Sequence, residues 1–281
     1  MPPTTCCCDG LHRGTADRPA RLVVFDFDQT LSCVHVFKIL AGWEQEQLAV
    51  DPPFALTEWG QVRRIFELNA TEPFNKNGGF ALAAFGGPDR VKMLRRLLCL
   101  LADRGVKVVI CTRGLTGTVK KCLHDVGLDG LISEVFGNTA DCYGQHDYDE
   151  EIAFGRTTST EQFYAASSQE CRFEWDSKDK LIEQVMLEFD PVLDRSQVIF
   201  VDDDAQEIEM GQRVSRTIWV SEAEGITPEH CQMIGRWTQP KKDKKGSKLP
   251  KPKEDSRTDP PLNARTDRRS SVHSTYSRGP F

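Results

Sequence analysis

The chain has 281 residues, of which 39% are hydrophobic and 28% charged, so it can bury the core of one large α/β domain with insertions or the cores of two small domains. Its formal net charge of −6 argues against a nucleic-acid-binding core, and no apolar run approaches the roughly 18 residues that a membrane helix needs. The ten cysteines include no C-x-x-C pair, which argues against a zinc site or a disulfide framework and predicts a reducing, cytoplasmic location.

Both ends of the chain are predicted to be disordered. Residues 1–20 have no hydrophobic periodicity, and residues 239–281 carry 12 Lys and Arg against 5 Asp and Glu with almost no large apolar side chains. Cys6–Cys8 could be S-acylated and associate with a membrane, and a leader without a role is the alternative. The basic tail is expected to be solvated rather than to bind nucleic acid. One folded domain is expected between them, over residues 21–238.

The first predicted element, Leu22–Phe25, is a buried strand, because it is apolar on both faces and contains β-branched residues. It runs directly into Asp26 and Asp28. Burying an unpaired carboxylate is costly, so a strand that ends in two acids needs a cation beside it. A divalent metal held by oxygen ligands meets that need, and a solvated acidic turn is the alternative.

Residues 32–87 contain several aromatic side chains, which predict a folded insertion that is long enough for a small helical cap. A second insertion, residues 137–175, is either a lid or a loose surface excursion. The remaining apolar periodicity predicts helices over Asp89–Arg104, Thr116–Val126 and Lys178–Phe189, and strands over Val106–Cys111, Leu131–Phe136, Val198–Val201 and Thr217–Val220. Strands that alternate with helices predict an α/β, Rossmann-like parallel sheet with helices on both faces and a reactive site beyond the carboxyl ends of the strands.

The second predicted strand leads into Thr112, Arg113 and Gly114 and then into a helix. A hydroxyl followed by glycine at the start of a helix can hold a phosphate oxygen, with help from the backbone N–H groups there. Threonine is also a common residue at helix N-termini, so an N-cap role for Thr112 is the alternative.

Lys178 stands at the predicted start of a helix. The N-terminal end of the helix dipole is already positive, so a lysine there is unfavourable unless it reaches an anionic site. A solvated lysine is the alternative.

The strand Val198–Val201 ends, like the first strand, in carboxylates: Asp202, Asp203 and Asp204 follow it in a row. Two neighbouring strand ends loaded with acids would repel each other unless a cation lies between them. Asp26, Asp28 and Asp203 offer the oxygen ligands that suit Mg²⁺, a metal that also takes substrate phosphate.

In this order the four pieces resemble the motifs of the haloacid dehalogenase-like (HAD) hydrolase superfamily. The matching residues are Asp26-Phe-Asp28-Gln-Thr30 for the first motif, Thr112 for the second, Lys178 for the third, and Asp202-Asp203 with Glu207 for the fourth. Lys180 is a rival for the third motif, but the spacing of Lys178 to the apolar stripe of its helix is closer to the family pattern. Gln29 and Asp202 stand where many members have glycine, and neither departure removes a catalytic group.

The resemblance implies a phosphotransferase mechanism. Asp26 would attack phosphorus and become an aspartyl-phosphate, and Asp28 would act first as general acid and then as general base. The phosphoryl group would be bound by Thr112, Arg113, Gly114 and Lys178.

The resemblance also implies a Mg²⁺ cofactor. Its ligands would be Asp26, the main-chain carbonyl of Asp28, and Asp203, with Asp202 and Glu207 nearby.

The second aspartate favours one reaction within the family, because dehalogenase members lack this acid/base and need no metal. Asp28 therefore predicts a phosphatase that hydrolyses a phosphate monoester. Since residues 32–87 can form a cap, we expect a small phosphorylated metabolite rather than a phosphoprotein as substrate. A phosphomutase, or a catalytically silent scaffold that presents the insertions and the tail to a partner, are the alternatives.

Overall fold

The computed structural model describes residues 18–44, 47–138, 177–221 and 224–240. Most of the predicted leader with Cys6–Cys8, the second insertion beyond Asn138 and the basic tail beyond residue 240 lie outside this part of the chain. The folded domain begins slightly earlier than predicted. Ala20 is buried, and its backbone N–H donates to the carbonyl of Trp237 at 2.8 Å.

A parallel sheet forms the centre of the domain, as predicted. Its order is β3-β2-β1-β4-β5, and every neighbouring pair runs parallel. The strands are β1 (Leu22–Phe25), β2 (Lys107–Leu115), β3 (Glu134–Asn138), β4 (Val198–Asp202) and β5 (Arg216–Trp219). The first strand lies in the middle, with β2 and β4 on its two sides. The carboxyl ends of β1, β2 and β4 therefore meet at one edge of the sheet.

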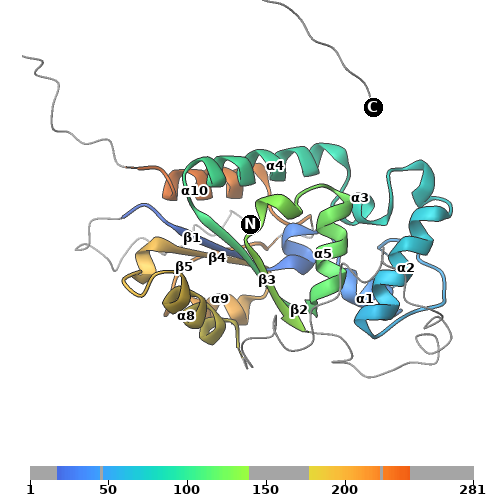
Figure 1. Cartoon of the computed structure of the whole chain (residues 1–281), viewed down its shortest axis with the longest axis horizontal. Helices are drawn as coiled ribbons and strands as arrows, with labels where there is room; N and C mark the ends of the chain where they lie inside the picture. The colour runs from blue at the N-terminus through green and yellow to red at the C-terminus, as the bar shows by residue number, and fades with distance from the viewer. Residues whose placement is uncertain (1–17, 45–46, 139–176, 222–223, 241–281) are drawn as a thin grey trace, which may run out of the picture. The chain divides into compact units, whose positions relative to one another are not determined.

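Helices cover both faces of the sheet, which confirms the α/β class (Figure 1). On one face, α4 (Pro88–Asp103), α5 (Thr116–Asp125) and α10 (Pro228–Trp237) pack over Val23 and Phe25. On the other face, α8 (Lys178–Phe189) and α9 (Ala205–Gly211) pack over Leu22 and Val24. The alternating side chains of β1 are buried on both sides, because each face has its own helical layer.

The 32–87 segment is helical, as predicted. It contains α1 (Val36–Leu40), α2 (Glu58–Ala70) and α3 (Phe80–Ala84). Phe37 of α1 packs with Leu115 at the carboxyl end of β2. The buried carboxylate of Glu58 accepts a hydrogen bond from the N–H of Gly117 at 2.6 Å, which joins α2 to the first turn of α5. The first helix of this segment therefore lies beside the edge where the strands end.

Several element boundaries differ from the predicted ones. The second strand does not stop at Cys111 but continues to Leu115 through a shift in its pairing with β3. The third strand begins at Glu134 rather than Leu131, because a one-turn 3₁₀ helix over Asp129–Leu131 precedes it. The short helix α9 and the helix α10 were not predicted. For α10 a signal was present, since Thr227 caps a helix that starts with Pro228.

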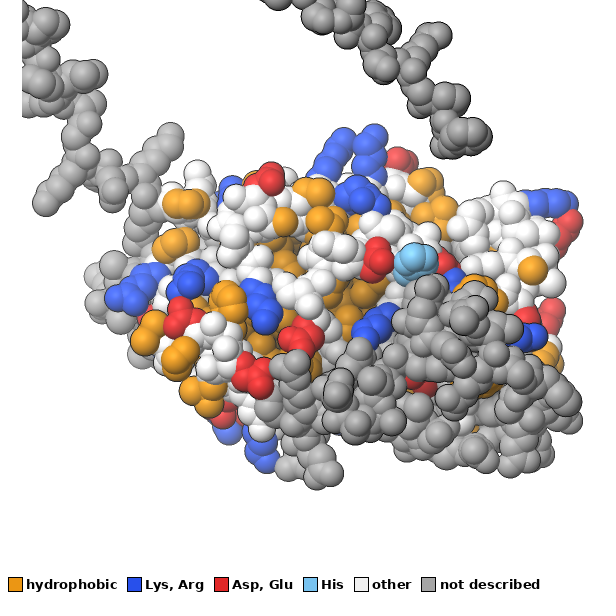
Figure 2. Space-filling model, in the orientation of Figure 1, with side chains coloured by type: hydrophobic (Ala, Val, Ile, Leu, Met, Phe, Trp, Pro, Cys, Tyr) orange, Lys and Arg blue, Asp and Glu red, His pale blue; other side chains and the backbone are white. Residues whose placement is uncertain are grey.

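The surface of the described part mixes charges of both signs. On the face shown in Figure 2, acidic and basic side chains are interspersed. Within the described ranges, no helix combines the length and apolarity that crossing a membrane requires.

Candidate active site

Carboxylates from two strands converge at the carboxyl edge of the sheet. Phe25 of β1 pairs with Val201 of β4, and the N–H of Asp26 donates to the carbonyl of Val201 at 2.8 Å. This register places Asp26 beside the acids that follow β4. Carboxylate oxygens of Asp26, Asp202 and Asp203 lie within 4.8 Å of one another. The predicted convergence of acids from distant parts of the sequence is thus present.

Lys178 lies between two of these acids. Its Nζ donates to Oδ1 of Asp26 and to Oδ2 of Asp202, each at 2.7 Å, and all three side chains are buried. Burial by itself would lower the pKa of Lys178, but the two carboxylates raise it above its ordinary value, so the ammonium stays charged. The rival Lys180 is exposed. The structure therefore places Lys178 at the acids and explains a lysine at the start of α8.

The carboxyl groups next to Lys178 have raised pKa values. Burial raises the pKa of Asp26 to about 6, against the lowering effect of Lys178. Burial and the charge of Asp26 raise the pKa of Asp202 to about 7. Burial and the neighbouring Asp202 also raise the pKa of Asp203. One lysine does not balance three carboxylates, of which Asp26 and Asp202 are buried and Asp203 is half-buried, so the cluster favours a further cation.

The two acids after β4 have different surroundings. Asp202 uses Oδ2 for Lys178 and accepts the N–H of Asp204 on Oδ1 at 2.8 Å. Asp203 accepts the hydroxyl of Thr30 on Oδ1 at 3.2 Å, and its carbonyl accepts the indole N–H of Trp219 at 2.9 Å. Because both oxygens of Asp202 are hydrogen-bonded, Asp203 and Asp26 are better placed than Asp202 to offer an oxygen to a metal.

Asp28 is held by the start of α1. Its Oδ1 accepts the backbone N–H of Val36 at 2.7 Å, and its Oδ2 lies 3.3 Å from Nδ1 of His35. Between Asp26 and Val36 the backbone makes a turn in which Gln29 has a φ of +56°, the left-handed region that favours glycine. Burial, followed by the charge of Asp26, raises the pKa of Asp28 to about 8. A carboxyl with such a pKa can carry a proton near neutral pH, as a general acid must.

Thr112 lies on β2, two residues before the glycine that approaches Asp28. Its buried Oγ1 accepts the N–H of Gly114 at 3.0 Å, which leaves the hydroxyl its own proton to donate. A Cβ built on Gly114 would lie 3.4 Å from Oδ2 of Asp28, so the turn and the acid approach closely. The alternative role of Thr112 as an N-cap is wrong, because α5 begins at Thr116 and its cap residue is Leu115.

Arg113 lies at the rim of the site, with a side chain that is 60% exposed. Its Nη2 forms an ion pair with Oε1 of the buried Glu207 at 2.5 Å. The other oxygen of Glu207 accepts the backbone N–H of Lys178 at 3.4 Å. The pair therefore links β2 and α9 to the start of α8.

Sequence analysis did not single out three residues near the site: His35, Trp219 and Gly137. His35 comes only seven residues after Asp28, yet a lone histidine in an apolar stretch carries no signal of its own. Gly137 matters because a Cβ there would lie 2.8 Å from the carbonyl oxygen of Gly114. That contact joins two strands, so no local pattern could reveal it.

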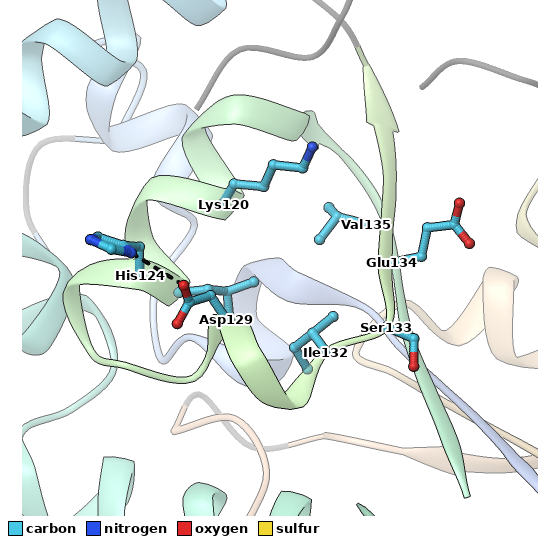
Figure 3. A pocket seen from close by; sticks show the side chains of 8 residues that line it. Lys120, His124, Asp129, Ile132, Ser133, Glu134 and Val135 are labelled. Atoms are coloured by element: carbon cyan, nitrogen blue, oxygen red, sulfur yellow. Dashed lines mark hydrogen bonds and ion pairs between the residues drawn. The ribbon is translucent and has the colours of Figure 1, made fainter. Parts of the chain in front are cut away.

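A groove of about 370 Å³ lies elsewhere, between α5 and β3 (Figure 3). Among its lining residues are Lys120, His124, Asp129 and Glu134, and His124 pairs with Asp129 at 3.2 Å. The groove contains none of the predicted site residues. The groove is therefore separate from the acidic cluster at the carboxyl edge.

No family model matches the chain, and no curated protein matches it. Solved structures that resemble it include the HAD domain of the effector protein Lem4 from Legionella pneumophila, with 16% identity, 78% of this chain and 95% of that one covered, and a TM-score of 0.40.

Two further solved structures show a similar degree of likeness. One is a haloacid dehalogenase-like family hydrolase from Streptococcus pneumoniae, with 12% identity and a TM-score of 0.37. The match covers 76% of this chain and 90% of that one. The other is a predicted phosphoglycolate phosphatase from Haemophilus somnus, with 15% identity and a TM-score of 0.37. The match covers 73% of this chain and 86% of that one.

Proposed function

We propose that this chain is a phosphatase of the HAD hydrolase superfamily, which hydrolyses a phosphate monoester through an aspartyl-phosphate on Asp26. The observation that carries the proposal is the pairing of Lys178 with both Asp26 and Asp202 at the carboxyl ends of β1 and β4. Burying two carboxylates against one lysine, with the half-buried Asp203 beside them, costs free energy that a purely structural ion pair would not require. Such clusters of perturbed acids are typical of functional sites.

Mg²⁺ suits the donor set. The ligands would be carboxylate oxygens of Asp26 and Asp203 and the main-chain carbonyl of Asp28, with Asp202 close by. A bound Mg²⁺ would neutralise the charge that the phosphoryl oxygens and these acids share. Oxygen-only donors among buried acids fit this cation better than zinc, which prefers nitrogen and sulfur ligands.

The residues of the chain supply the other parts of a phosphoryl transfer. A carboxylate oxygen of Asp26 forms a bond to phosphorus while the bond from phosphorus to the leaving oxygen breaks. Asp28 gives its proton to that oxygen. In the second half, Asp28 takes a proton from water as the water oxygen attacks phosphorus, and the carboxylate of Asp26 is released.

Lys178 and Thr112 contribute positioning and charge. The ammonium of Lys178 lies against the nucleophile and offsets its repulsion of an incoming phosphate, and the hydroxyl of Thr112 donates to a phosphoryl oxygen. Since α1 lies beside Asp28, the 32–87 segment is close to where a leaving group would sit. This placement supports a small phosphorylated metabolite as the substrate that we propose. The proposed reaction takes place in the cytoplasm.

The test is a screen of phosphorylated metabolites and phosphopeptides with Mg²⁺, using wild type and Asp26→Asn. We expect Mg²⁺-dependent release of phosphate by wild type and a loss of about a thousandfold or more in Asp26→Asn, because the nucleophile is neutralised without a change of shape. Asp129→Asn, which makes the same change in the separate groove, is the matched control and should keep wild-type activity.

Three outcomes would contradict the proposal. Appreciable turnover by Asp26→Asn would remove Asp26 as the nucleophile. An isomerised rather than dephosphorylated product would favour a phosphomutase. No turnover of any compound by a folded wild-type protein would favour the scaffold.

A further inference from the structure

The imidazole of His35 occupies an unusual place beside the candidate acid. His35 precedes α1, and its side chain is 22% exposed. Its Nδ1 is buried and makes no hydrogen bond, although Oδ2 of Asp28 is only 3.3 Å away. A buried polar atom without a partner is unfavourable, so such atoms usually have a partner or a function.

The carboxyl group of Asp28 is confined by this arrangement. Oδ1 is committed to the N–H of Val36 at 2.7 Å. Oδ2 lies against Gly114, where a Cβ would be 3.4 Å away, and against Nδ1 of His35. The backbone N–H groups of Val36 and Phe37 both hydrogen-bond this carboxyl group. His35 lies next to Oδ2, the oxygen that is not bonded to Val36.

Nδ1 of His35 and Oδ2 of Asp28 are 3.3 Å apart, slightly more than in a usual N–H···O hydrogen bond, and the two atoms do not form one. Catalytic hydrogen bonds often tighten when a substrate binds. A small rotation of the imidazole ring or of the carboxyl group would bring Nδ1 and Oδ2 into a hydrogen bond.

We propose that His35 is a positioning residue, whose Nδ1 hydrogen-bonds Oδ2 of Asp28 and fixes the orientation of that carboxyl group toward the leaving oxygen. The inference rests on the phosphatase function proposed above. In the step it supports, the bond between phosphorus and the leaving oxygen breaks, that oxygen receives the proton of Asp28, and Asp26 gains the bond to phosphorus. His35 exchanges no proton with the substrate and touches it only through Asp28.

A comparison of leaving groups tests the proposal. Departure of a primary alcohol needs protonation by Asp28, whereas p-nitrophenolate leaves without it. In His35→Leu we expect kcat/KM for glycerol 1-phosphate to fall about tenfold or more, and kcat/KM for p-nitrophenyl phosphate to change less than about threefold. His35→Asn, whose side-chain amide reaches the position of Nδ1, should recover most of the loss. His124→Leu, on the exposed side of α5, is the matched control.

A second readout does not depend on turnover. In long-range ¹H–¹⁵N spectra of the folded protein, the Nδ1 resonance of His35 should differ between wild type and Asp28→Ala, because Asp28→Ala removes the partner oxygen. The His124 resonance should be the same in both. The spectra separate this inference from the proposed function, since they report the contact even where no ester is turned over.

The inference is overturned by either of two results. One is an equal loss for both esters in His35→Leu, or a loss that His35→Asn does not recover, which would make His35 merely structural. The other is a His35 Nδ1 resonance that is the same in wild type and in Asp28→Ala. If wild type hydrolyses neither these esters nor any compound of the screen, the proposed phosphatase function is wrong. The positioning role of His35 in that reaction is then wrong as well.

Discussion

Lys178 shows how single residues build the site. Its ammonium is 2.7 Å from both Asp26 and Asp202, although these acids are 176 residues apart in the chain and Lys178 lies on a third element. Removing one member of a buried ion pair leaves a charge without a partner. Removing Lys178 would leave two such charges facing each other, so this residue should be important for stability as well as for activity.

We therefore expect Lys178→Met to lower the free energy of unfolding by roughly 3–5 kcal/mol in metal-free buffer, because two buried carboxylates lose their partner. Urea denaturation measures the change. Lys180→Met, an exposed neighbour on the same helix, should change it by about 0.5 kcal/mol or less. Equal stability of Lys178→Met and wild type would mean that the acids are not charged together in the folded state.

The element that shapes the side of the site opposite β4 is β2. Its pairing with β3 shifts between Cys111 and Leu115, and within this stretch Gly114 comes close to Asp28 while the strand continues. The neighbouring strand must come very close for this to happen. A side chain does not fit at Gly137 of β3, because a Cβ there would lie 2.8 Å from the carbonyl oxygen of Gly114.

Gly137→Ala should therefore displace the backbone of residues 112–114 and lower kcat/KM, by about tenfold to a hundredfold, since small misplacements of positioning groups are costly. Steady-state kinetics with Mg²⁺ measures the loss. Gly130→Ala is the control on the turn before β3, where a Cβ would meet nothing within 4 Å, and it should leave kcat/KM unchanged. A Gly137→Ala protein with normal kinetics would show that the 112–114 turn does not need this approach.

At the scale of the domain, the parallel sheet explains why acids that repel one another are placed together. Helices on both faces bury the strands, and the parallel register brings the ends of β1 and β4 to the same edge. The fold thereby creates a local excess of negative charge that a divalent cation would relieve. Binding of such a cation to the folded state alone must stabilise that state.

We expect MgCl₂ to raise the Tm of wild type, by an amount equivalent to about 2.7 kcal/mol at a concentration of 100 times Kd. Asp203→Asn should lose most of this increase, because a ligand oxygen becomes a neutral amide, whereas Asp129→Asn should keep it. Thermal unfolding with and without EDTA measures both. A response to Mg²⁺ that Asp203→Asn leaves unchanged would remove Asp203 from the metal site.

Much of the fold could be read from local patterns. The apolar stripes predicted α4, α5 and α8 to within one residue at either end, and Leu22–Phe25 is a strand with the predicted bounds. These elements are long or strongly apolar, and a buried face leaves a periodic record in the sequence. The acids after the first and fourth strands could also be recognised in the sequence, because charged residues directly after buried strands are unusual.

Local sequence patterns are therefore enough to predict the elements, their α/β class and the residue types that gather at the carboxyl edge. Contacts between distant residues show which acids pair with Lys178, that Thr112 is no N-cap, and that His35 lies at Asp28 and Gly137 at Gly114. Periodicity records whether a side chain is buried. The identity of its neighbour depends on the register of strands far apart in the chain and on a left-handed turn at Gln29, and neither leaves a local pattern.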